Sequence, residues 1–286
     1  MQSILIATKP IIKNKPANIV LNSEGALSTH ELHKGQTLTI SKVSDGGDKH
    51  CVGWYDIATH TNHVCETSSV VDKKYGSCYQ CRQKTGFNPG FYYSNEVSDK
   101  QREYNNSPHT VYVAFFGGEL YKAGIMSDSR GLQRIYEQGA ILYVIVGSYT
   151  DANAARKQEE GLIAQGLKNS ITKRQKQNYY KDLYRIDATE AKSGFEEKLK
   201  AIGLEDSKVE NNLEFFFYGI KPGDKITPIT DQPVSGEIVG VIGSYLVIKN
   251  EGRLYGSWLN KFEGYEVVIK DKVMSIEPEP MQSSLF

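Results

Sequence analysis

The segment 111–163 most constrains the fold, because it predicts a strand, a turn, a second strand, a helix, a third strand and a second helix in immediate succession. A β-branched and aromatic run at 111–116 reads as the first strand. Gly117 and Gly118 follow, a pair typical of a two-residue hairpin turn, and 119–125 is the returning strand. The first third of this segment therefore predicts a β-hairpin.

The remainder of the segment alternates helices with a buried strand. Apolar residues at helical spacing end at Gly139, which predicts a helix closed by a left-handed glycine. A buried strand follows at 141–146, and Thr150 or Asp151 can cap a further helix whose inner face includes Leu162. The segment as a whole predicts a small unit of the α+β class.

Four residues of this segment follow one another in a recognisable order: Tyr112 on the first strand, Gly124 on the second, Arg134 on the first helix and Glu159 on the last. This order resembles the GIY-YIG nucleases. The resemblance implies a three-stranded antiparallel sheet with flanking helices and a catalytic set of Tyr112, Arg134 and Glu159, with Mg²⁺ or Mn²⁺ at Glu159. The chemistry is consistent, since phosphodiester hydrolysis requires a carboxylate for a cation, a guanidinium for phosphorane charge and a group that orients water.

The chain departs from the GIY-YIG pattern at two positions. Where the family has the second tyrosine of its motif, this chain has Lys122, and the neighbouring Tyr121 would point to the opposite face of the strand. Gln138 stands where many members carry histidine. Lys122 therefore joins Tyr112 as a candidate for positioning or activating water.

Motifs spread over most of the chain carry a second, closer resemblance. They are Cys51, Cys65, Cys78, Cys81, 87–89, 109–114, 122–125, Arg134, 137–140, Ala155, Arg156 and Glu159. Together they resemble a bacterial family of unknown function that couples a four-cysteine cluster to a variant of the GIY-YIG core. This resemblance indicates ancestry and leaves activity open.

Composition limits the partners and the compartment. The 286 residues can form two or three compact units. Lys plus Arg and Asp plus Glu are equal at 34 each, so a phosphate-binding surface must arise from local segregation of charge. Neither a leader pattern nor a membrane-spanning run is present in the sequence, which predicts a cytoplasmic protein without a membrane partner. In that compartment four cysteines indicate metal binding more than disulfides.

The cysteines have the spacing of a zinc site. They are Cys51, Cys65, Cys78 and Cys81. The last two form a C-x₂-C pair, whose thiolates can face one tetrahedral ion. His50, His60 or His63 could replace a cysteine as ligand, and ordinary buried thiols are a further alternative. Four protein ligands leave no open position for water, so a zinc ion here would be structural.

Six residues are candidates for contacts with nucleic acid, and three of them belong to a basic and aromatic stretch after Glu159. The candidate nucleic-acid contacts are His109, Arg130, Arg156, Lys173, Arg174 and Lys176. The last three belong to a basic, tyrosine-containing stretch that suits a helix along a phosphate backbone, or else a solvated amphipathic helix. His109 could reach the active-site mouth or lie on the surface. Aromatic residues at Phe87 and 91–93 could stack on bases or pack as core.

The flanking regions predict β-rich modules. Strand-like runs occur before residue 50, and runs with glycine at each corner between 213 and 273 suggest a small β-barrel-like module that the N-terminal strands could complete. The predicted units are an N-terminal module at 1–50, a zinc-binding region at 51–108, a core at 109–205, a C-terminal β module at 206–275 and a tail at 276–286.

The C-terminal tail carries a candidate docking peptide. Gln282-Ser-Ser-Leu-Phe286 resembles the short peptide by which bacterial replication and repair enzymes bind the sliding clamp. In such a peptide Leu285 and Phe286 would enter an apolar pocket, while Gln282 would make polar contacts at its edge.

Two hypotheses follow from the sequence. The first is a metal-dependent DNA endonuclease acting in replication or repair and recruited by the sliding clamp. The second is a non-catalytic, zinc-containing DNA-binding adaptor that uses the same face of the core. RNA is a third possibility as ligand, because backbone chemistry alone does not distinguish the sugars.

Overall fold

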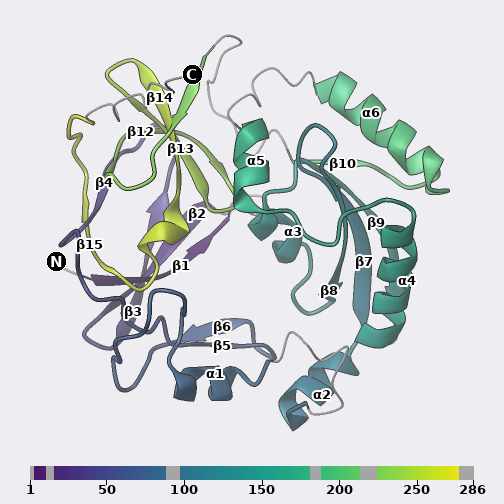
Figure 1. Ribbon diagram of the computed structural model, residues 1–286, viewed down its shortest axis with the longest axis horizontal. Helices are drawn as coiled ribbons and strands as arrows, with labels where there is room; N and C mark the ends of the chain where they lie inside the picture. Colours follow the sequence, from purple (N-terminus) through teal and green to yellow (C-terminus); the bar gives the residue numbers. More distant parts are fainter. Residues whose placement is uncertain (1–2, 11–15, 88–96, 181–187, 213–223, 277–286) are drawn as a thin grey trace, which may run out of the picture.

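The computed structural model describes residues 3–10, 16–87, 97–180, 188–212 and 224–276 (Figure 1). Its fold is mixed α+β, as predicted. Over the described residues the strands form a nine-stranded, a four-stranded and a two-stranded sheet. The four-stranded sheet and the nine-stranded sheet lie beside each other, and the small sheet lies below them in this view.

The four-stranded sheet contains the predicted hairpin and the strand that follows it. Its strands are β7 (His109–Phe115), β8 (Tyr121–Ser127), β9 (Leu142–Tyr149) and β10 (Glu210–Asn211). They pair in the order β10-β9-β7-β8, and every pairing is antiparallel. The three strands β7 to β9 thus form an antiparallel sheet, to which β10 adds a short edge.

The first helix of the core ends, and the second begins, at the predicted signals. They are α3 (Gln133–Gln138) and α4 (Ala152–Ala164). Gly139 ends α3 with φ 75°, and the Asp151 side chain caps α4 by accepting a hydrogen bond from the Ala154 N–H. Both signals are local, which is why the sequence alone locates them.

The hairpin turn differs from the prediction of a two-residue loop. Phe116 N–H donates to the Leu120 carbonyl at 3.0 Å, so residues 117–119 form a three-residue loop. Both glycines have positive φ, 108° at Gly117 and 52° at Gly118. The helical residue Tyr179 packs directly on them, since a Cβ on Gly118 would lie 2.1 Å from its ring. The turn is therefore packed against Tyr179, a tertiary contact that the Gly-Gly sequence alone does not reveal.

The nine-stranded sheet combines strands from both ends of the chain. Its members are β1 (Ser3–Lys9), β2 (Ala17–Ser23), β3 (Ala26–Leu32), β4 (Thr37–Lys42), β11 (Ile226–Pro228), β12 (Val234–Ile242), β13 (Tyr245–Asn250), β14 (Arg253–Trp258) and β15 (Glu266–Lys270). A 3₁₀ helix, η2 (Leu259–Phe262), connects the last two. The order is β11-β14-β13-β12-β4-β15-β1-β2-β3, with β4 between two C-terminal strands.

This arrangement corrects the predicted barrel-like module. Among the described residues the two edge strands β11 and β3 are not paired with each other, so the sheet is open. Residues from both ends share one core cluster, in which Leu38 and Ile40 of β4 lie with Ile238 and Ile248. Insertion of β4 covers edges that β12 and β15 would otherwise expose.

The cysteine region is a small unit with little regular structure. It contains β5 (Trp54–Asp56), β6 (Thr61–His63) and α1 (Tyr79–Thr85), and α2 (Asp99–Asn105) follows it. His50 N–H donates to the Gly264 carbonyl at 2.7 Å, which attaches this region to the large sheet. Of the predicted aromatic patch, Phe87 packs edge-on against Tyr104, and residues 91–93 lie outside the described residues.

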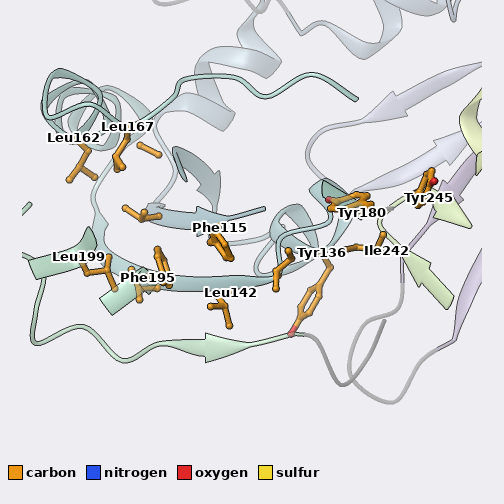
Figure 2. Packing of buried hydrophobic residues seen from close by; sticks show 14 of the residues in the cluster. Phe115, Tyr136, Leu142, Leu162, Leu167, Tyr180, Phe195, Leu199, Ile242 and Tyr245 are labelled. Carbon is orange, nitrogen blue, oxygen red and sulfur yellow. The ribbon is translucent and has the colours of Figure 1, made fainter. Parts of the chain in front are cut away.

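Two further helices cover the core. They are α5 (Lys173–Tyr180), which is the first part of the predicted basic helix, and α6 (Ala188–Ala201). Phe195 of α6 stacks on Tyr121 at 6.0 Å between ring centroids, so Tyr121 belongs to a different cluster from Tyr112, as the alternation of the strand predicts. Tyr180 of α5 packs beside Tyr245 of the large sheet (Figure 2). One apolar cluster therefore joins both sheets.

The contact between β7 and β8 generates a stability prediction. Tyr112 and Gly124 are ladder partners, and a Cβ at Gly124 would lie 2.4 Å from the Tyr112 hydroxyl. We expect Gly124→Ala to lower the free energy of unfolding by about 1–3 kcal/mol, because the buried ring must move. Gly161→Ala in α4 meets nothing within 4 Å and should raise it by about 0.5–1 kcal/mol. Denaturant unfolding measures both free energies. A Gly124→Ala variant as stable as the wild type would contradict this packing.

Candidate active site

A cleft of about 410 Å³ opens between the hairpin, α3, α4 and α5. It is lined by Tyr112, Lys122, Ile125, Arg134, Gln138, Arg156, Glu159, Asn169, Ser170, Ile171 and Lys176. The four residues predicted as catalytic, Tyr112, Lys122, Arg134 and Glu159, are all among them. They come from β7, β8, α3 and α4, so the fold of the core unit brings them together.

Tyr112 is held in place on two sides. Its ring lies over Gly124, which leaves room for the phenol because glycine has no Cβ. Gln138 Nε2 donates a hydrogen bond to the Tyr112 hydroxyl oxygen at 2.7 Å, which leaves the hydroxyl proton for another acceptor. Gln138 thus positions Tyr112. Lys122 lies nearby, with Nζ 5.7 Å from the centroid of the Tyr112 ring.

Glu159 is a buried carboxylate with a basic partner. It is 4% exposed, and Arg156 Nη1 lies 2.5 Å from its Oε2, one helical turn away on α4. Arg156 Nε also reaches Glu160 at 3.1 Å. Among the described residues that line the cleft, Glu159 is the only carboxylate. Four basic side chains line it as well, namely Lys122, Arg134, Arg156 and Lys176.

Lys176 enters the cleft from α5. It is 9% exposed, its Nζ donates to the Gln138 carbonyl at 2.5 Å, and it lies 4.4 Å from the centroid of the Phe116 ring. Burial, together with the nearby cations Lys122 and Arg134, lowers the pKa of Lys176 to about 7. The basic pattern predicts Lys176 as a phosphate contact on the helix surface, whereas it is buried in the cleft. Its i,i+4 spacing from Tyr180 puts both residues on one face of α5, and the packing of Tyr180 makes that face the inner one.

The other predicted nucleic-acid contacts lie outside the cleft lining. His109 is buried at the start of β7, its Nδ1 is 2.8 Å from the Ser107 carbonyl, and burial lowers its pKa. Arg130 forms an ion pair with Glu137. Lys173 and Arg174 are exposed on α5 and are not among the lining residues. Of the six predicted contacts, Arg156 and Lys176 therefore line the cleft.

The four cysteines form a compact cluster. The sulfur atoms of Cys51, Cys65, Cys78 and Cys81 all lie within 4.8 Å of one another. Three of the four side chains are buried. The Cys51 sulfur accepts hydrogen bonds from the Gly53 and Cys78 N–H groups at 3.3 and 3.1 Å. These donors favour the thiolate, but burial outweighs them and raises the pKa of Cys51. The proximity of the four sulfur atoms is what makes the cluster able to bind a structural metal such as zinc.

The neighbouring residues support a four-cysteine site. Burial raises the pKa of Cys65, but hydrogen bonds from Thr67 and Ser69 outweigh it and bring that pKa down to about 6. His60 bonds to Tyr55 and Ser129, and His63 stacks on Trp54 at 4.1 Å between ring centroids. These histidines are therefore engaged elsewhere, and His50 is not part of the group of close ligand atoms found among the described residues.

The remaining predicted residues are those expected to bind a partner protein through the C-terminal tail. Gln282, Leu285 and Phe286, predicted to bind the sliding clamp, lie outside the described residues. No helix in the described part of the chain is both long and apolar enough to cross a membrane.

Comparison with known proteins places the chain in a family. The family described as "Protein of unknown function (DUF2797)" matches residues 35–267. The chain belongs to this family. No curated protein and no solved structure matches the chain. The DUF2797 match runs from β4 to β15 and includes both the cysteine cluster and the cleft. Because the family description assigns no activity, the function of this DUF2797 member must be argued from its own residues.

The cysteine cluster predicts the metal content. We expect purified protein to hold about one ion of a thiolate-binding metal such as zinc per chain, because four cysteine ligands complete a tetrahedral site. Cys78→Ser should lose most of that metal and lower the melting temperature, whereas His63→Ala should retain it. Elemental analysis and thermal unfolding measure both; full metal content in Cys78→Ser would contradict the assignment.

Burial of Lys176 predicts a pH dependence of stability. Its pKa is about 7 in the folded protein and near 10.5 for an ordinary lysine, so between these values the unfolded chain binds more protons. The free energy of unfolding should therefore rise with pH from 7 to 10 through this group.

Lys176→Met should lack this contribution, while Lys192→Met, at an exposed position on α6, should keep it. Denaturant midpoints of the two variants and the wild type across this pH range provide the measurement. Parallel curves for wild type and Lys176→Met would show that Lys176 titrates normally.

Proposed function

We propose that this protein is a metal-dependent endonuclease that hydrolyses phosphodiester bonds of DNA in the cleft. One observation carries the proposal: the cleft combines a single carboxylate, Glu159, with four basic side chains. The whole chain has a formal net charge of zero, so this excess of positive charge is a local feature. A concave site of this charge suits a phosphodiester group.

Arginine and lysine would bind and stabilise the phosphate. Arg134 on α3 presents a planar guanidinium that can contact two phosphate oxygens, and Lys122 adds a second cation from β8. Because the cleft is partly buried, these charges interact more strongly with the substrate than they would in water. They would act most strongly where negative charge develops on the phosphorane.

Tyr112 would orient a water molecule, and Lys176 would transfer a proton. Tyr112 accepts a hydrogen bond from Gln138, so its own proton is free to orient a water molecule or a substrate oxygen. Lys176, with a pKa of about 7, can exist in both protonation states near neutral pH. That property suits a group that transfers a proton in the reaction. Lys176 thereby supplies the proton transfer, for which Tyr112 and Lys122 are weaker candidates.

The residues of the cleft fit a hard divalent cation. Glu159 supplies a carboxylate, and Asn169 and Ser170 add amide and hydroxyl oxygens to the lining. One carboxylate can suffice for Mg²⁺ or Mn²⁺ when substrate phosphate and water complete the coordination. When bound, such a cation would polarise the phosphate and activate water. Arg156 would share Glu159 with it.

A second function is favoured by the ion pair itself. Arg156 already neutralises Glu159, and a carboxylate that serves only this pair needs no cation. The same cleft would then bind a phosphate backbone without cleaving it, as in a DNA-binding or RNA-binding adaptor. Recruitment to the sliding clamp through Gln282, Leu285 and Phe286 is compatible with either function, and its support is the C-terminal sequence pattern.

Cleavage assays separate the two functions. We expect the wild type to cleave labelled DNA with Mg²⁺ or Mn²⁺ and not with chelator, and Glu159→Gln to reduce the rate by about 10²–10³-fold. Glu160→Gln is the matched control, because Glu160 contacts the same arginine from an exposed position. Its rate should stay near that of the wild type.

The substrates are single-stranded, duplex and branched DNA, with single-stranded RNA for comparison. Binding without cleavage under all of these conditions, unchanged in Glu159→Gln, would establish the adaptor. Cleavage of RNA alone would correct the substrate class.

A further inference from the structure

The cysteine region presents exposed aromatic rings outside the cleft. Tyr79 is the first residue of α1 and is 69% exposed, although it stands in the chain between the clustered Cys78 and Cys81. Tyr75, in the loop before α1, is 40% exposed. The helix lies at the outer side of the molecule, below the small sheet in Figure 1. Two tyrosines so exposed in a small region indicate a contact surface more than a core.

Basic side chains surround these rings. Lys74 Nζ lies 4.9 Å from the centroid of the Tyr75 ring, and the Arg82 guanidinium lies 4.5 Å from it. Arg82 and Tyr79 are three residues apart on α1 and therefore lie on neighbouring positions of one helix face. Arg82 thus links the two tyrosines into one surface, to which Lys73 is adjacent in the loop.

The charges of this surface are unbalanced. Lys73, Lys74 and Arg82 are exposed and form no ion pair with described residues. Of the acidic groups nearby in sequence, Glu66 pairs with Lys84, and Asp72 accepts a hydrogen bond from the Lys74 N–H in the turn. Among these described residues, three cations therefore stand against one carboxylate without an ion pair, Asp72, which leaves a net positive charge.

The cysteine cluster fixes the orientation of Tyr79. Cys81 is buried, and the Cys78 N–H donates to the Cys51 sulfur at 3.1 Å, so both ends of the first helical turn are anchored. Lys74 and Arg82 contact the Tyr75 ring, whereas no ring contact involves Tyr79 among the described residues. The Tyr79 ring is therefore exposed for a further contact, and the anchored helical turn fixes its position.

We propose that this surface, formed by Lys73, Lys74, Tyr75, Tyr79 and Arg82, binds single-stranded nucleic acid. Tyr79 stacks on an unpaired base, and the three basic side chains contact the flanking phosphates, with Tyr75 supporting Arg82. Stacking requires a base whose face is accessible, which duplex interiors do not offer. The proposal is independent of the cleft, because it needs neither cleavage nor a cation at Glu159.

Fluorescence anisotropy tests the proposal with a labelled DNA strand of about 12 nucleotides, within the range of known single-strand site sizes. The buffer contains no Mg²⁺ or Mn²⁺, so cleavage does not contribute. Tyr79→Ala should weaken binding by roughly fivefold to a hundredfold, since one stacked base contributes about that much. Tyr79→Phe keeps the ring and should bind within about twofold of the wild type.

The salt dependence provides a second measurement. The double variant Lys73→Ala with Lys74→Ala should reduce the slope of log affinity against log salt by about 1.4, since each phosphate contact contributes about 0.7. Val70→Ala, at an exposed position of the same region, should leave both affinity and slope unchanged. Metal content of each variant confirms that the cysteine cluster is intact.

Three results would overturn the proposal: equal affinity of Tyr79→Ala and wild type, equal competition by duplex DNA of the same length, or an unchanged salt slope in the lysine double variant. Failure of the endonuclease hypothesis would leave these outcomes untouched, because Glu159→Gln keeps this surface. Conversely, an active nuclease with none of these binding effects would refute only the single-strand surface.

Discussion

Tyr180 lies at the contact between the two main sheets, and the cleft depends on it. Its side chain is fully buried, its hydroxyl donates to the Gly139 carbonyl at 2.6 Å, and its ring packs on Tyr245 and Trp258. Burial raises the pKa of Tyr180, which keeps the hydroxyl protonated as a donor. Because Lys176 precedes Tyr180 by one helical turn, the same contact that joins the sheets also sets Lys176 against Gln138. The wall of the cleft is thus a consequence of core packing.

Among its described lining residues the cleft has more basic than acidic side chains. Four basic groups line it with one carboxylate, and Arg156 already occupies that carboxylate. Burial first, and the nearby cations second, lower the pKa of Lys176, so a charged lysine at this position has an energetic cost. Arrangements that sacrifice stability in this way are typical of functional sites. A bound phosphate would relieve the repulsion, which is why the charge pattern supports an anionic substrate under either proposed function.

The cysteine region has few apolar residues of its own, and its cluster is accompanied mainly by Trp54 and Val71. A metal can replace the missing core in a unit of this size. The region also contacts both larger parts of the chain, through the His50 N–H to Gly264 and through His60 to Ser129 on the core. These contacts hold the region, and with it the proposed single-strand surface, against both larger parts of the chain.

The sequence by itself determined what depends on neighbouring residues. The hairpin, the Gly139 and Asp151 helix signals and the alternation that separates Tyr112 from Tyr121 follow from local geometry, and the cysteine spacing indicates a metal cluster. Resemblance to a known core grouped Tyr112, Arg134 and Glu159, which the structure places in one cleft. The insertion of β4 between C-terminal strands, the three-residue turn under Tyr179 and the burial of Lys176 were decided only by the tertiary structure. Each of these depends on a partner far away in the chain, and local propensity carries no record of such a partner.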